Sequence, residues 1–313
     1  MHKEDNNKHA QLRDRHVKEI RHLLSGECVV ALDTSILDLL EKESEPGWFA
    51  EFVEMSNAGV RFVIPDLCVG ERIECFAKAR SSCIPSMKLK WRTMISRLDY
   101  IIWQELPCLP LRGDLFDLIG IHERDVAFSR HDPFTISTAK ELYKHLHDYE
   151  GSRYNAPNYR VPYEDEIKRK RDEWKRSVLN FRELLKTKDK NGREGSLVIE
   201  KERLLKFFLR AQEISFSFRG DNPSVLDLPF RYLIERIYDP KYCNPNLGRR
   251  TKNDGIDFLI LHLTMASINV CSTDCFFKRA RNLYSTKSSC CHAPETLLSD
   301  WRNGVLPRVD VPK

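Results

Sequence analysis

The sequence predicts an α/β fold, in which a parallel sheet lies between layers of helices and is interrupted by a mainly helical insertion. Three observations support this prediction: short apolar runs typical of buried strands, amphipathic segments between them, and a low glycine content of 13 in 313 residues. Glycine usually makes up about 7% of a chain, so its scarcity argues against a turn-rich all-β fold. Hydrophobic residues make up 41% and charged residues 31% of the chain, which excludes wholesale disorder.

Five short apolar segments are the expected strands. The segment CVVAL at 28–32 is continuous and β-branched, which is typical of a central strand buried on both faces. The other expected strands are RFVIP at 61–65, YIIW at 100–103, INVCS at 268–272 and SSCCH at 288–292. Helical patterns are found at 9–24, 35–43, 48–59, 67–80, 86–97, 257–267, 273–284 and 294–303. This alternation predicts parallel strands joined by crossover helices.

The alternating pattern divides the chain. Residues 1–105 and 225–313 are predicted to form one α/β domain, and residues 106–224 are predicted to form a basic, helical insertion with an irregular first part at 106–159. Within the insertion, residues 160–210 contain 16 Lys and Arg against 10 Asp and Glu. The whole chain carries a formal charge of +5, so the excess of base lies in this block and the rest of the chain is close to neutral.

The basic block allows two interpretations. The run Lys168, Arg169, Lys170 and Arg171 is a candidate surface for contacting phosphates. A solvated helix with ion pairs four residues apart explains the mixed charges equally well. Aromatic residues at helical spacing, such as Trp174, are expected to belong to a core rather than to stack on bases.

The sequence also indicates a location. The first 27 residues mix acidic and basic side chains without an apolar stretch, unlike a signal peptide, and no apolar run approaches the roughly 20 residues of a membrane span. We therefore expect a cytoplasmic protein with no membrane partner. The ten cysteines are expected to be reduced thiols, and their spacing matches no common zinc site.

Acidic residues follow the expected strands. Asp33 stands directly after the first strand, Glu71 lies in the helix after the second, and Asp274 follows INVCS. Asp254 and Asp257 are three residues apart at a helix start, and so share a face. Ligands of open parallel sheets collect at the carboxyl ends of the strands, so these carboxylates are expected to meet there. Mutual repulsion then requires protonation or a bound cation, and Mg²⁺ or Mn²⁺ suits an all-oxygen site.

The motifs VVALDTSIL, RFVIPDLCVGERIE, KNDGIDFLILHLTMAS and NVCSTDCFF, in this order, resemble those of the PIN-domain nucleases. The resemblance covers roughly 25–105 and 225–313, and it implies a PIN-like sheet sandwiched by helices. It further implies that Asp33, Glu71, Asp257 and Asp274 are catalytic metal ligands, with Asp254 as an accessory acid. Thr34 and Thr273 would then bind a scissile phosphate or position a ligand. The implied activity is Mg²⁺- or Mn²⁺-dependent hydrolysis of phosphodiester bonds by an endoribonuclease, which matches two-metal chemistry.

Structural alternatives remain for each acidic residue. Asp33 could instead cap the following helix, and Glu71 could belong to a solvated helix face. Asp254 and Asp257 could complement a helix dipole, and Asp274 an Asx-turn. Our leading prediction is an endonuclease for single-stranded RNA. The alternatives are an inactive PIN-like module that binds nucleic acid or serves as a scaffold, and an effector nuclease held inactive by a regulatory protein partner.

Overall fold

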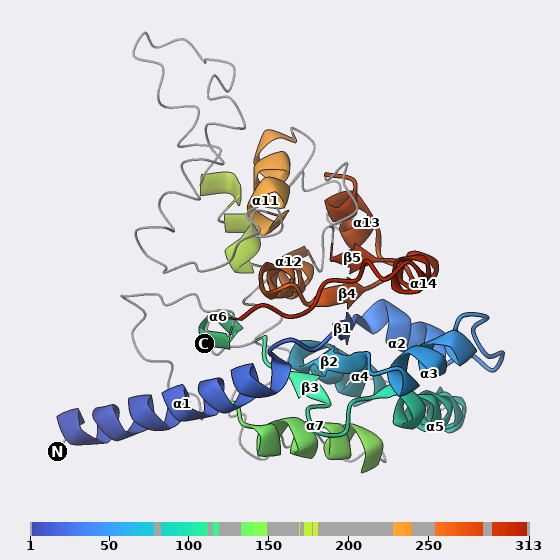
Figure 1. Ribbon diagram of the computed structural model, residues 1–313, viewed down its shortest axis with the longest axis horizontal. Helices are drawn as coiled ribbons and strands as arrows, with labels where there is room; N and C mark the ends of the chain where they lie inside the picture. The colour runs from blue at the N-terminus through green and yellow to red at the C-terminus, as the bar shows by residue number, and fades with distance from the viewer. Residues whose placement is uncertain are drawn as a thin grey trace, which may run out of the picture.

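The computed structural model describes residues 2–77, 83–111, 115–118, 133–148, 169, 172–176, 178–180, 228–239, 254–283 and 290–311 (Figure 1). Its centre is a five-stranded sheet in the order β3-β2-β1-β4-β5. The strands are β1 (Val29–Leu32), β2 (Arg61–Pro65), β3 (Cys108–Leu109), β4 (Asn269–Cys271) and β5 (Cys291–His292). Every pair of neighbours is parallel. The predicted parallel α/β fold is therefore confirmed.

Helices connect and cover these strands. They are α1 (His2–Leu24), α2 (Thr34–Leu40), α3 (Phe49–Asn57), α4 (Asp66–Ala77), α5 (Ile84–Ile101), α6 (Leu115–Leu118), α7 (Ile136–Asp148), α11 (Leu228–Tyr238), α12 (Asp254–His262), the 3₁₀ helix η3 (Leu263–Ala266), α13 (Cys275–Arg281) and α14 (Pro294–Arg302). Figure 1 shows α11, α12 and α13 gathered on the side of β4 and β5, whereas α4 and α7 lie near β2 and β3 and α5 lies beside α3.

The central strand is buried because its residues are apolar on both faces. Val29, Val30, Ala31 and Leu32 have no exposed surface, and they belong to one continuous hydrophobic core. Both neighbours of β1 are likewise buried, apart from Arg61 at the start of β2. Helices cover both sides of a parallel sheet, so a central strand without a polar face is expected.

The predicted strand at 100–103 is wrong. Helix α5 continues to Ile101, because the buried residues Trp91, Met94, Leu98 and Ile101 extend its helical spacing to that point. Only Ile102 then makes an isolated parallel bridge to Phe62 of β2, and the edge strand follows at β3. A short apolar run does not by itself distinguish a strand from the buried end of a helix.

The expectation of an irregular segment at 106–159 is also wrong within the described residues. The edge strand β3 pairs with β2, and α7 is a regular helix that packs against α4 and β3. Farther along, Trp174 is buried and its ring lies 4.3 Å from that of Phe258 in α12. This part of the predicted insertion therefore contributes to the core, as expected for Trp174.

Candidate metal centre

The candidate site lies where β1 and β4 end. Asp33 follows β1 directly and begins α2, while Ser272, Thr273 and Asp274 connect β4 to α13. Because β1 and β4 are adjacent and parallel, their carboxyl ends lie side by side, as predicted. Helix α4 packs beside α2, and α12 packs beside α13, so that Glu71 and the two acids of α12 approach from either side.

Asp33 is held in one orientation by two hydroxyl groups. The side chains of Ser272 and Ser35 donate hydrogen bonds of 2.7 and 2.8 Å to Asp33 Oδ2, and the backbone N–H of Ser35 lies 3.4 Å from the same atom. The Cys68 thiol lies 4.0 Å from Oδ1. Burial raises the pKa of the Asp33 carboxyl, although these hydrogen bonds oppose the shift. Asp33 is thus the cap of α2, as the structural alternative proposed, and it is also a buried acid of the site.

The two serines join the ends of β1 and β4. Ser35 Oγ accepts from the backbone N–H of Thr273 at 3.0 Å, and Ser272 Oγ accepts from that of Asp274 at 3.0 Å. Asp274 is exposed and caps α13 by accepting from the backbone N–H of Phe276 at 2.7 Å. The sequence interpretation missed both serines. Their positions in the sequence could have indicated them, since Ser35 lies two residues after one site aspartate and Ser272 lies two residues before another.

Glu71 is positioned by one hydrogen bond and by the ion pairs of its neighbour Arg72. The hydroxyl of Thr34 donates a 2.7 Å hydrogen bond to Glu71 Oε2. The next residue, Arg72, is buried and forms ion pairs with Asp38 and Glu41 at the end of α2. These pairs hold α4 against α2 and keep Glu71 near the end of β1. Thr34 therefore orients the carboxylate of Glu71 in this structure.

Asp257 shows that the predicted acids share one environment. Its carboxyl is buried in the first turn of α12. Burial raises its pKa well above the ordinary value, and the charges of Asp33, Asp274, Glu71 and Asp254 raise it further. The charges of the other four predicted acids therefore all act on Asp257, although the five residues come from three distant parts of the sequence. Without a cation, Asp257 binds a proton more tightly than an isolated aspartate does.

The donor set fits a hard divalent ion by its chemistry. All predicted ligands are carboxylate oxygens, which Mg²⁺ and Mn²⁺ prefer. Among the described residues, however, no three His, Cys, Asp or Glu side chains converge closely enough to hold a metal ion. Electrostatic interaction extends over longer distances than coordination bonds do. Mg²⁺ commonly keeps several waters and contacts only one or two carboxylates, so a hydrated ion is the form that this arrangement suits.

Tyr232 of α11 is a site residue that the sequence interpretation missed. Its side chain is 1% exposed, and its ring packs 4.1 Å from that of Phe276. The hydroxyl has no hydrogen-bond partner within the described residues. Burial raises its pKa, and the charges of Asp254 and Asp257 act in the same direction. Tertiary packing brings α11 beside α12 and α13, so no local sequence motif could have predicted that Tyr232 lies at the site.

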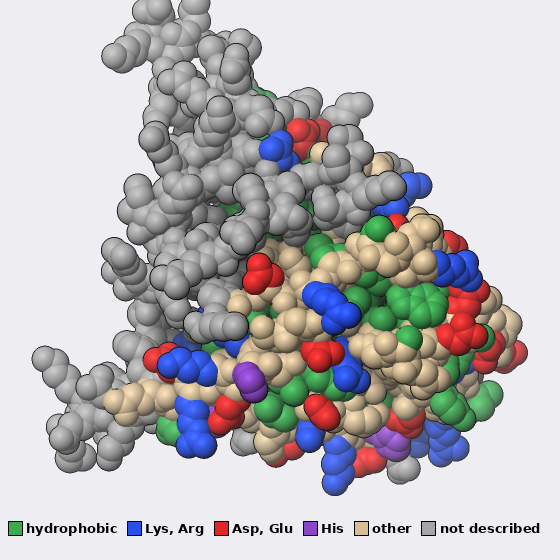
Figure 2. Space-filling view, in the orientation of Figure 1, with side chains coloured by type: hydrophobic (Ala, Val, Ile, Leu, Met, Phe, Trp, Pro, Cys, Tyr) green, Lys and Arg blue, Asp and Glu red, His purple; other side chains and the backbone are tan. Residues whose placement is uncertain are grey.

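The predicted phosphate-contacting run is mostly outside the described residues. Lys168, Lys170 and Arg171 lie there, whereas Arg169 is exposed and forms an ion pair with Glu173 one turn later. That pair is the contact expected of a solvated helix. Two other exposed cations, Lys278 and Arg279, lie on α13, the helix that Asp274 caps, and the charge of Arg279 acts on Tyr232. Over the described face in Figure 2, acidic and basic side chains are otherwise interspersed.

The remaining sequence predictions concern thiols and membranes. The described cysteines are free thiols, and Cys271, Cys290 and Cys291 are buried in or beside the sheet. Burial raises the pKa of Cys290 to about 12, so this thiol stays protonated. Among the described helices, none combines the length and the apolar character needed to cross a membrane.

Comparison with known proteins adds no relative. No protein-family model matches the chain, and neither the curated proteins nor the solved structures contain a significant match.

Proposed function

We propose that this protein is a Mg²⁺- or Mn²⁺-dependent endonuclease of PIN-like type that hydrolyses phosphodiester bonds in single-stranded RNA. One observation carries the proposal: Asp33 and Asp274 follow the adjacent parallel strands β1 and β4, and their charges, with those of Glu71 and Asp254, act on the buried carboxyl of Asp257. Such a concentration of negative charge favours a bound cation. The order of the motifs that resemble PIN-domain nucleases supports the same assignment.

In this proposal Asp33, Glu71, Asp257 and Asp274 hold one or two ions, with Asp254 beside them. The ions would supply an activated water and neutralise charge on the leaving oxygen. Ser35 and Ser272 fix the orientation of the Asp33 carboxylate through Oδ2, so this side chain would lose little freedom on holding an ion. Such preorganisation lowers the cost of assembling the site.

Asp257 would exchange a proton with the solvent, and residues near Asp274 would contact the substrate. A bound cation would favour the ionised form of Asp257, since its positive charge would offset the burial and the neighbouring acids that raise the pKa of this carboxyl. Lys278 and Arg279 project from the helix that Asp274 caps, and they would attract the RNA backbone to this edge of the sheet. Thr273 is exposed beside Asp274 and is placed to contact a phosphate.

A second candidate function is a PIN-like module without activity, which binds nucleic acid or serves as a scaffold. The observation that favours it is the set of internal hydrogen bonds made by Asp33, Glu71 and Asp274, together with the absence of a converged ligand triplet among the described residues. The two functions differ in one property, which is cleavage that depends on these carboxylates.

The test is a cleavage assay with end-labelled single-stranded RNA, duplex RNA and single-stranded DNA, each in Mg²⁺, Mn²⁺ and EDTA. We expect the single-stranded RNA to be cut with either metal, and we expect EDTA, Asp33→Asn and Asp274→Asn to abolish cleavage. Asp14→Asn, an exposed change on α1, is the matched control. Wild-type cleavage rates in both site variants would refute the assignment, and a wild-type protein that cuts none of the substrates would leave the scaffold function.

A further inference from the structure

A groove lies between the end of α4, one face of α5 and the end of α7. It has a volume of about 420 Å³, and its apolar wall consists of Phe76, Trp91 and Ile95. The indole N–H of Trp91 donates a 3.0 Å hydrogen bond to the backbone carbonyl of Leu146 in α7. This bond and the edge contact between Phe76 and Trp91, with centroids 5.4 Å apart, fix the wall. The groove is therefore preformed, and its volume lies in the range of small-molecule sites, roughly 300–1,000 Å³.

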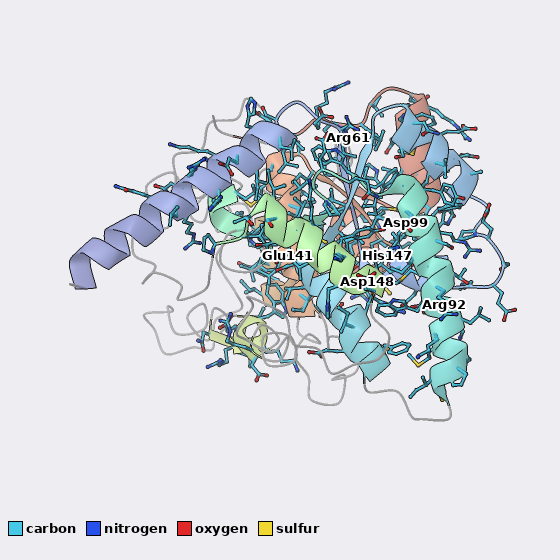
Figure 3. All side chains as sticks on the ribbon, turned by 90° about the horizontal axis from the view of Figure 1, so that it is seen from below. Arg61, Arg92, Asp99, Glu141, His147 and Asp148 are labelled. Carbon is cyan, nitrogen blue, oxygen red and sulfur yellow. The ribbon has the colours of Figure 1, made fainter. Side chains whose placement is uncertain are left out.

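The acidic groups of the groove already have partners. Asp99 accepts a 2.7 Å hydrogen bond from the hydroxyl of Tyr143, and its other oxygen lies 3.3 Å from His147 Nε2. The second ring nitrogen of His147 lies 3.2 Å from Asp148. Figure 3 shows these groups where the end of α7 faces α5. Both carboxylates thus contact His147, and Asp99 also contacts the Tyr143 hydroxyl, so these acids already have partners within the protein.

The basic groups of the groove are not paired in this way. Lys88 and Arg92 lie one turn apart on α5, and both line the groove. Neither forms an ion pair with any residue that the structure describes. Two cations on the same helix face repel each other. An anion bound between them relieves that repulsion, and the planar guanidinium group matches two oxygens of a phosphate.

We propose that this groove binds a nucleotide-sized organic phosphate, with the phosphate held by Lys88 and Arg92 and the organic part lying along Phe76, Trp91 and Ile95 toward Asp99. The ligand is either a free nucleotide or one nucleotide of an RNA strand, since both present the same phosphate and ring chemistry. The groove contains none of the five site acids, so the inference stands independently of the nuclease assignment.

The test is calorimetric binding of AMP, with adenosine and inorganic phosphate as separate probes, in EDTA so that the carboxylate site holds no metal. We expect AMP to bind more tightly than either fragment. The combined Lys88→Gln, Arg92→Gln protein should bind AMP at least about tenfold more weakly, because two charge-assisted contacts are lost. Lys90→Gln, an exposed change on α5 outside the groove, should leave AMP binding unchanged.

The inference is overturned if AMP does not bind the wild-type protein, if the combined variant binds AMP as the wild type does, or if adenosine binds as tightly as AMP. Competition between AMP and a trinucleotide RNA separates the two sources of the ligand. Displacement of AMP by the RNA assigns the groove to a strand, and AMP binding that withstands the RNA assigns it to a free nucleotide.

Discussion

Replacing Tyr232 with Phe should stabilise the metal-free protein. The usual result of this change at a hydrogen-bonded tyrosine is a loss of roughly 0.5–1.5 kcal/mol. Tyr232, however, is 1% exposed, and its hydroxyl has no partner in the described part of the chain. An unsatisfied buried polar group costs about 1–3 kcal/mol. Removing it should therefore raise the free energy of unfolding by about 1–2 kcal/mol, while the ring keeps its packing against Phe276.

The assay is urea unfolding in EDTA, supported by thermal melting, where the gain corresponds to roughly 2–4 °C per kcal/mol. Tyr143→Phe is the matched control, because that buried hydroxyl donates to Asp99 at 2.7 Å. It should lose about 1.5–3 kcal/mol, as expected for a bond to a charged acceptor. A Tyr232→Phe protein destabilised as much as the Tyr143→Phe control would refute the reasoning.

Three further changes test the packing around the site. In EDTA, the stability of the wild-type protein should fall as pH rises from the unfolded-state pKa of an aspartate through the raised folded-state pKa of Asp257. Asp257→Asn should flatten this part of the pH profile, measured by urea unfolding at several pH values. An unchanged slope in the variant would contradict the raised pKa. Ser272→Ala removes bonds to Asp33 and from the N–H of Asp274 and should cost about 2–3 kcal/mol in urea unfolding, whereas a neutral effect would mean that the serine does not orient Asp33. Trp174→Ala should cost about 3–5 kcal/mol if its helix packs on α12 through Phe258, and a loss under about 1 kcal/mol, the range of surface changes, would show that it does not.

The parts of the fold that the sequence predicted are those with strong local signals. The β-branched run before Asp33 could be assigned because a buried parallel strand needs apolar residues on both faces. The strands at 61–65, 268–272 and 288–292 followed from the same pattern and contain the observed β2, β4 and β5. Strand β3 could not be predicted, since two residues carry no periodicity and only pairing with β2 defines them.

Some residues of the candidate site could likewise be predicted from the sequence, and others could not. Asp33, Glu71, Asp254, Asp257 and Asp274 could be chosen because parallel strands bring their carboxyl ends to one edge. Ser35 and Ser272 were missed because a hydroxyl beside a strand end is common and gains meaning only through its distance from Asp33. Tyr232 and the groove of α4, α5 and α7 depend on packing between helices distant in sequence, which no spacing rule encodes.

Calorimetric measurement of Mn²⁺ binding tests most directly whether the five acids form a cation site. The wild-type protein and the Asp14→Asn control should bind Mn²⁺, and an ion concentration of 100 times Kd should raise the free energy of unfolding by about 2.7 kcal/mol. Asp257→Asn and Asp33→Asn should lose most of both effects. Wild-type protein that binds no Mn²⁺, or site variants that bind it as tightly as the wild type, would contradict this assignment.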